Sequence, residues 1–118
     1  MFAQTGCTLC HTPSMKTGPN AIVALNEQDV HLYSDLLTHY MGGALDDGII
    51  EGAAGGGRWR TAPLWGLRAR NFFLHDGRAT DLVTAIRLHG GEASGVRTRF
   101  SNLPASQRAD VIAFLQSL

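Results

Sequence analysis

The sequence predicts an all-α domain with three to five helices and a long glycine-rich loop. Three stretches place apolar residues at helical spacing, and no stretch shows the polar–apolar alternation of a half-buried strand. Half of the 14 glycines fall within residues 42–57, which indicates irregular loop structure over about residues 42–67. A length of 118 residues suits one compact unit, so we expect a single domain over residues 1–118.

The first predicted helix spans residues 30–41 and would end before Gly42. Glycine often ends a helix because it adopts left-handed backbone angles without strain. The apolar side of this helix would consist of Leu32, Leu36, Leu37 and Tyr40.

The second predicted helix spans residues 80–89, and the third runs from Pro104 to the end of the sequence. Thr80 or Asp81 would cap the second helix, and proline suits the first turn of the third. The apolar stripes are Leu82, Ala85, Ile86 and His89 in the second helix and Val111, Ile112, Leu115 and Leu118 in the third. A histidine therefore ends the stripe of the second helix, and we expect His89 to face the interior.

Composition and charge exclude several classes of function. Ten basic and ten acidic residues give no net charge, and no basic stripe is visible, which argues against nucleic-acid binding. No apolar run approaches the roughly 20 residues needed to span a bilayer. Hydrophobic residues make up 44% of the sequence and charged residues 17%, the balance of an ordinary globular domain.

The sequence C-x-x-C-H at Cys7, Cys10 and His11 is the pattern of covalent c-type haem attachment. Residues 7 and 10 share one side of a helical turn, so both thiols can reach one porphyrin, and His11 would bind the iron. We therefore expect a short helical piece at residues 7–11 and one covalent haem c. The glycine-rich loop would wrap the haem, giving a cytochrome c-type haem domain with a small protein core.

Thioredoxin-like chemistry, zinc binding and chance each account less well for the motif than haem attachment does. A thioredoxin-like C-x-x-C needs a preceding strand in a βαβ unit, and residues 1–6 are too few to supply it. A structural zinc site needs four ligands, and the sequence has no further cysteine. With both cysteines in the motif, none is left for a structural disulfide, and the attached haem would stabilise the domain instead.

The second axial ligand of the iron is expected to be His89. A buried imidazole needs a partner, and iron is an available one. Met41 is the alternative, since His/Met ligation is common in cytochromes c. The remaining candidates are Met15, His31, His39 and His75. We expect His31 and His39 to be solvated on the polar side of the first helix.

Cationic and aromatic residues between Arg58 and Arg78 are expected near the haem. One or two arginines would bind the propionates, and Arg68 and Arg70 are the selected candidates among five. Trp65 is expected to pack on the haem. His75 is expected to form a hydrogen bond near the haem edge or to an adjoining domain. The other residues of this group are Arg58, Arg60, Arg78, Trp59, Phe72 and Phe73.

Residues 59–118 resemble the C-terminal haem domain of the di-haem thiol oxidoreductase-like proteins, which are similar to bacterial di-haem cytochrome c peroxidases. The matching stretches are residues 60–68 (RTAPLWGLR), 73–79 (FLHDGRA) and 88–93 (LHGGEA). Residues 33–37 (YSDLL) and 41–42 (MG) also match, so the resemblance covers nearly the whole chain.

The resemblance implies a cytochrome c fold and a periplasmic location. In the peroxidase relatives, an H-D-G motif precedes a short helix that ends in the axial methionine of the electron-donating haem. His89 occupies that position here, so the resemblance implies a histidine in place of the methionine. Full-length members carry two haem motifs, and this chain carries one. We therefore expect a segment of a longer exported protein, one that relays electrons to or from a second haem domain or a redox partner protein.

Two main functions follow from these observations. The first is electron transfer through one six-coordinate c-type haem with His/His ligation. The alternative is the catalytic haem domain of a peroxidase or thiol oxidoreductase, which needs an open iron site and an acid–base residue above it. A haem-based gas sensor, in which a diatomic gas displaces His89, is a weaker third hypothesis.

Overall fold

The computed structural model describes all residues from 1 to 118, and helices form most of its regular structure. The four α-helices are α1 (Phe2–Thr5), α2 (Leu82–Arg87), α3 (Ser94–Asn102) and α4 (Ala105–Gln116). The four short strands are β1 (Met15–Lys16), β2 (Asp29–Val30), β3 (Thr38–Tyr40) and β4 (Arg58–Arg60). Five single turns of 3-10 helix complete the structure: η1 (Cys7–Leu9), η2 (Val23–Leu25), η3 (Gly43–Leu45), η4 (Leu67–Ala69) and η5 (Gly91–Ala93). None of the helices is both long and apolar enough to cross a lipid bilayer.

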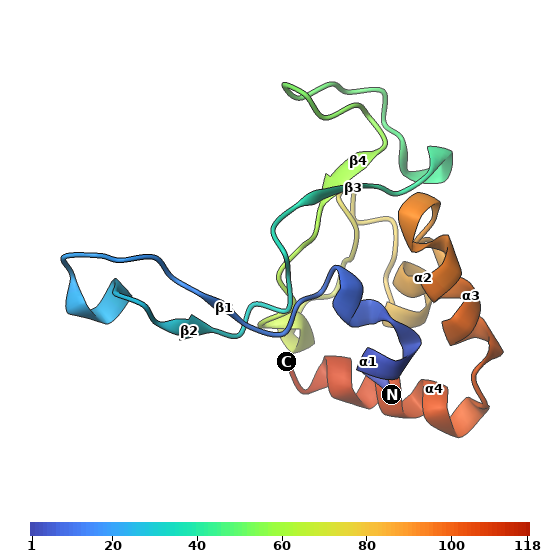
Figure 1. Cartoon of the computed structure of the whole chain (residues 1–118). Coiled ribbons are helices and arrows are strands. Elements are labelled where there is room, and N and C mark those ends of the chain that lie inside the picture. Colours follow the sequence, from blue (N-terminus) through green and yellow to red (C-terminus); the bar gives the residue numbers. More distant parts are fainter.

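The hydrophobic core is small and lies between α4, α1, α3 and the segment around η4 (Figure 1). It consists of Phe2, Leu64, Leu67, Phe100, Val111 and Leu115. Phe100 and Val111 are almost completely buried, at 1% and 0% exposed. The ring of Phe2 packs on that of Phe114 with 5.0 Å between centroids, and this contact joins the two ends of the chain.

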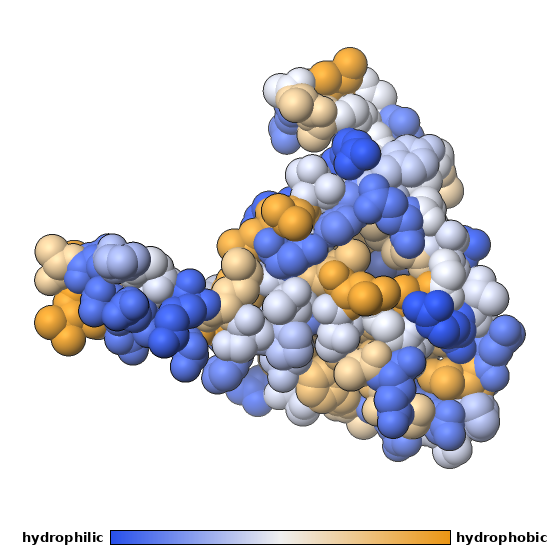
Figure 2. All heavy atoms as spheres, in the orientation of Figure 1, coloured by the Kyte–Doolittle hydropathy of each residue, from blue (hydrophilic) through white to orange (hydrophobic).

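Two arms project from this body (Figures 1 and 2). The first arm, residues 15–30, is closed by the antiparallel pair β1–β2, in which Met15 faces Val30. The second arm, residues 46–56, leaves the antiparallel pair β3–β4. Apolar side chains are exposed at both tips, with Val23 83% and Ile50 74% exposed.

Helices α2 and α4 confirm two of the three predicted helices. Asp81 caps α2, and its carboxylate accepts a hydrogen bond from the Thr84 N–H at 2.8 Å. Pro104 lies directly before α4, and the predicted stripe faces the core, with Val111 and Leu115 buried. In these two segments, the apolar stripe in the sequence therefore predicted a helix correctly.

The predicted helix at residues 30–41 is wrong. The structure has an irregular segment followed by strand β3, and Tyr33 and Leu36 have positive φ values of 51° and 60°, which no right-handed helix contains. Two side chains compete for the backbone: the Ser34 hydroxyl accepts the Leu36 N–H, and the Asp35 carboxylate accepts the Leu37 N–H. The apolar spacing here does not mark a buried face, since Leu36 and Leu37 are exposed.

The four strands and helix α3 were not predicted from the sequence. The strands have two or three residues each, too few to show alternation. Helix α3 buries only Phe100, so it has no apolar stripe to detect. The all-α prediction is therefore right about the main elements and incomplete in detail. The predicted glycine-rich loop exists, but it is interrupted by η3 and β4.

Candidate functional site

The C-x-x-C-H motif lies on a tight turn that follows α1. The turn η1 begins after Gly6, whose φ of 95° lets the chain change direction between the two elements. The His11 N–H donates to the Cys7 carbonyl at 2.9 Å and closes the turn. This confirms the short helical piece predicted at residues 7–11, as a 3-10 turn over Cys7–Leu9.

Both thiols of the motif are free, partly buried and protonated at neutral pH. Burial raises the pKa of Cys7 to about 11. Burial also raises the pKa of Cys10, and the negative charges of Asp35 and Glu92 add to the effect. Redox-active C-x-x-C pairs need a thiol with a lowered pKa, so these environments argue against thioredoxin-like chemistry.

His11 is oriented by the irregular segment that replaces the expected first helix. Its Nδ1–H donates to the Tyr33 carbonyl at 2.9 Å. The positive φ of Tyr33 helps to aim this carbonyl, and the Asp35 N–H donates to the Cys10 carbonyl at 2.8 Å, which ties the segment to the motif. Ser34 is fully buried, and its hydroxyl donates to the Thr61 carbonyl at 2.7 Å.

His89 lies just beyond the end of α2, whereas the predicted helix over residues 80–89 included it. Its Nδ1–H donates to the Ala85 carbonyl one turn earlier, at 2.8 Å. Gly90 and Gly91 follow, so the chain leaves the helix immediately after this side chain. The ring is therefore held by its own helix, and two glycines, which restrict the backbone least, follow it in the chain.

The two histidines present equivalent free nitrogen atoms. A carbonyl can only accept, so Nδ1 carries the proton in both rings, and Nε2 is left with its lone pair. Burial lowers the pKa of His11 and of His89, which keeps both rings neutral at pH 7. Every buried side-chain nitrogen or oxygen has a hydrogen-bond partner, and neither Nε2 atom has one. Both Nε2 atoms must therefore be accessible rather than buried. A charge on His89 would lower the pKa of His11 further.

This donor set fits a haem group. Two neutral imidazoles with free Nε2 atoms are the usual axial ligands, and two thiols on one turn are the usual attachment points. The hydrogen bond from each Nδ1–H to a backbone carbonyl is the common way to fix a ligating ring.

The segment after His89 packs tightly on the end of β3. A Cβ on Gly91 would lie 2.1 Å from the Tyr40 carbonyl oxygen, and one on Gly90 would lie 2.7 Å from that of Met41. The structure therefore brings the chain at Met41, the alternative axial ligand, next to the chain at His89. Met15 lies in β1 of the first arm and is 38% exposed.

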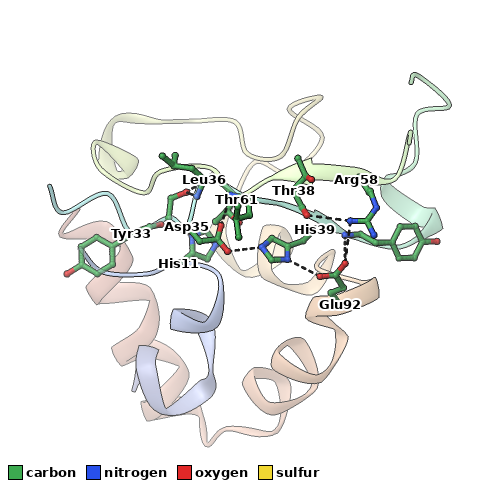
Figure 3. A network of polar contacts seen from close by, with 12 residues as sticks. His11, Tyr33, Asp35, Leu36, Thr38, His39, Arg58, Thr61 and Glu92 are labelled. Atoms are coloured by element: carbon green, nitrogen blue, oxygen red, sulfur yellow. Dashed lines mark hydrogen bonds and ion pairs between the residues drawn. The ribbon is translucent and has the colours of Figure 1, made fainter. Parts of the chain in front are cut away.

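His39 is the main correction to the predicted histidine environments. It was expected to be solvated, but its side chain is 19% exposed and lies between two carboxylates (Figure 3). Its Nε2 is 2.8 Å from Asp35 Oδ2, and its Nδ1 is 2.9 Å from Glu92 Oε2. Hydrogen bonds to Glu92 and Asp35 raise the pKa of His39. His31 is exposed, as predicted.

A cluster of metal-ligating groups also involves His39. One ligand atom from each of Cys10, Asp35 and His39 lies within 4.8 Å of the others. A structural zinc site needs four ligands, and this cluster supplies three without a further cysteine. Both ring nitrogens of His39 are already used by Asp35 and Glu92, so the hydrogen-bond network accounts for the cluster.

The predicted propionate and packing residues lie on an exposed part of the molecule. Arg68, Arg70 and Trp65 are exposed, and Trp65 keeps 52% of its surface accessible. The two arginines line a cavity of about 290 Å³ together with Leu67, Asn71, Phe73, residues 80–83, Ile112 and Gln116. Neither His11 nor His89 lines this cavity, so the propionate assignment stays a prediction.

His75 stacks on an aromatic ring. Its imidazole lies 3.6 Å from the Trp59 ring, centroid to centroid, and the two planes differ by 11°. The Trp59 Nε1–H donates to the Leu45 carbonyl at 2.9 Å. The carboxylate of the neighbouring Asp76 lies 3.8 Å from the His75 ring and bonds instead to Arg78. The role of His75 near a haem edge stays a prediction.

The residues that hold the site together have no local sequence pattern that predicts them. The carbonyl of Tyr33, the buried Ser34 and the carboxylate of Glu92 are recognisable only from contacts between distant segments. The one available signal was Glu92 itself, three residues after His89 and directly after two glycines.

Comparisons with known proteins support the redox interpretation. The comparisons with curated proteins and with solved structures gave no match. A family model described as "Di-haem oxidoreductase, putative peroxidase" matches residues 1–118. The family implies a cytochrome c-like domain, in agreement with the small core and the C-x-x-C-H turn. Because the match covers the whole chain, this protein belongs to the di-haem oxidoreductase family.

Proposed function

We propose that the chain transfers electrons through one haem c, which Cys7 and Cys10 would attach and whose iron His11 and His89 would hold. The observation that carries the proposal is the pair of neutral imidazoles, each with Nδ1–H bonded to a carbonyl and Nε2 free. When bound, the haem supplies one-electron chemistry at its iron.

The protein groups in this proposal have separate tasks. The two thiols would each form a thioether bond to the haem, and burial, which raises the pKa of Cys7 to about 11, keeps that thiol protonated at neutral pH until then. Tyr33 and Ala85 orient the two rings through their carbonyls. Two histidine ligands would lower the reduction potential relative to His/Met ligation, because methionine raises it.

A second candidate is the catalytic domain of a peroxidase or thiol oxidoreductase. The family description favours it, and so does the nearness of Cys10 to a carboxylate and a histidine, Asp35 and His39, which supply acid–base groups. This function would need an open iron site, so His89 would not hold the haem iron. The gas-sensing alternative has the same requirement.

The partner and the location follow as further parts of the proposal. The family is a di-haem family and this chain has one attachment motif, so we propose that it exchanges electrons with a second haem domain or a redox partner protein. Covalent haem attachment takes place after export in bacteria, which supports a periplasmic location.

The proposal is tested by producing the protein in a host that attaches haem to C-x-x-C-H motifs. A pyridine haemochrome assay should give one haem per chain, and acid–acetone should not extract it. The ferric and ferrous spectra should be low-spin. Purified, fully matured protein without haem, or with zinc instead, would overturn the proposal.

A further inference from the structure

We propose that Asp35, His39 and Glu92 act together as a positioning link that holds the two axial histidines at a fixed separation. This inference rests on the proposed function, because it assigns His11 and His89 to one haem. The three residues come from three segments: the turn after residue 34, strand β3 and the 3-10 turn η5 (Figure 3). None of them would touch the iron.

One end of the link is fixed to the attachment motif. The Asp35 N–H donates to the Cys10 carbonyl at 2.8 Å, directly before His11. The Asp35 carboxylate contacts the His39 Nε2 at 2.8 Å. The Asp35 side chain is only 15% exposed, so water competes weakly for this contact.

The other end is fixed to the segment that follows His89. Glu92 receives two hydrogen bonds: the His39 Nδ1–H reaches Oε2 at 2.9 Å, and the Tyr40 N–H donates to Oε1 at 2.9 Å. The weaker contact with Arg58, at 3.8 Å and half exposed, adds little. The chain of contacts thus runs from Cys10 through Asp35 and His39 to Glu92.

The need for such a link arises from the two glycines after His89. Gly90 and Gly91 have more backbone freedom than other residues, so they would let the end of α2 move. Glu92 is the first residue beyond this pair, and its two bonds to β3 fix the chain there. The glycines are required for the same packing, since a Cβ on Gly91 would overlap the Tyr40 carbonyl. The link therefore stiffens the one point where the distal histidine would otherwise be mobile.

The test compares the haem-loaded wild type with Glu92→Ala, Glu92→Gln and the control Glu51→Ala, whose carboxylate lies in the second arm and forms no ion pair or hydrogen bond. Carbon monoxide can bind ferrous iron only when His89 leaves, so its association rate reports how firmly that ring is held. We expect Glu92→Ala to bind carbon monoxide about tenfold faster, equal to about 1.4 kcal/mol, and to show a high-spin ferric fraction. Glu92→Gln keeps an acceptor for the Tyr40 N–H and a donor for a neutral His39, so it should stay near the wild-type rate.

The outcomes separate the link from the proposed function. A wild type without low-spin haem overturns both. A low-spin wild type with equal carbon monoxide rates in Glu92→Ala and Glu51→Ala overturns the link alone. A Glu92→Gln variant that binds carbon monoxide as fast as Glu92→Ala also contradicts the link, because the link acts through hydrogen bonds that glutamine can form. If Glu92→Ala does not accumulate, His39→Gln, which cannot bridge both carboxylates, should give the same faster binding and faster amide exchange at Tyr40. Wild-type behaviour in His39→Gln overturns the link.

Discussion

The two histidines of the site are held in different ways. His11 follows two cysteines on one tight turn, and the Tyr33 carbonyl orients it from a segment with positive φ and a fully buried serine. His89 lies at the end of a six-residue helix, before two glycines, and the segment after it is fixed by packing on β3. The His11 ring is thus held by the carbonyl of a segment 22 residues away, whereas the His89 ring bonds only to its own helix and the chain after it is placed by packing on β3. We therefore expect that an open coordination site on the iron would form on the His89 side.

The largest effect should come from the attachment turn. Replacing both Cys7 and Cys10 by serine removes both thioether bonds, so matured protein should release its haem into acid–acetone completely, whereas the wild type should retain it. Extraction followed by absorbance measures this directly. Retention of the haem by the double variant would contradict covalent attachment at these residues.

The second-largest effect should come from the distal histidine. His89→Ala should convert the ferric spectrum from low-spin to high-spin, raise the reduction potential and allow rapid carbon monoxide binding, because one axial position opens. His31→Ala is the matched control, since His31 is exposed. An unchanged spectrum in His89→Ala would show that His89 is not the ligand and would turn attention to Met41.

The third effect concerns the stability of the segment that orients His11. Ser34→Ala removes a buried hydroxyl that bonds the Thr61 carbonyl and the Leu36 N–H, and should cost about 2 kcal/mol of unfolding free energy. Ser14→Ala, at an exposed position, should cost almost nothing. Urea titration of the haem-loaded protein measures both.

Ser34→Ala and Gly91→Ala should also differ in carbon monoxide binding. Gly91→Ala places a Cβ against the Tyr40 carbonyl at a φ of 50° and should speed binding, because it displaces the segment after His89. Ser34→Ala should leave the rate unchanged, since it acts on the proximal side. Equal carbon monoxide binding rates in the two variants would contradict the difference between the His11 and His89 sides.

The smallest effect is the contribution of His39 to the pH dependence of the unfolding free energy. Its pKa is raised above the ordinary value of 6.5, first by the hydrogen bond to Glu92 and then by that to Asp35. The protonated ring therefore stabilises the fold fully below pH 6.5, and this contribution is lost as the pH rises through the higher folded-state pKa. The difference in unfolding free energy between wild type and His39→Gln should thus shrink on going from pH 6 to alkaline pH. A difference that grows over this range would contradict the assignment.

The sequence predicted those parts of the molecule that depend on local pattern. The C-x-x-C-H turn, the cap at Asp81, the stripe of α4 and the inward position of His89 all follow from neighbours one turn away. The failures lie where contacts between distant segments decide. Leu32, Leu36 and Leu37 have helical spacing, but bonds from residues 34 and 35 to Thr12, Cys10 and Thr61 fix an irregular chain instead. The position of His39 between two carboxylates has the same origin, because Glu92 is 53 residues away.

The central claim is tested most directly by near-infrared magnetic circular dichroism of the ferric, fully matured protein. Ligation by His11 and His89 predicts the charge-transfer band of a low-spin haem with two histidine ligands. A sulfur-to-iron band would indicate Met41 or Met15 as the ligand, and a high-spin spectrum would indicate an open iron site. Either result would contradict the assignment of His89.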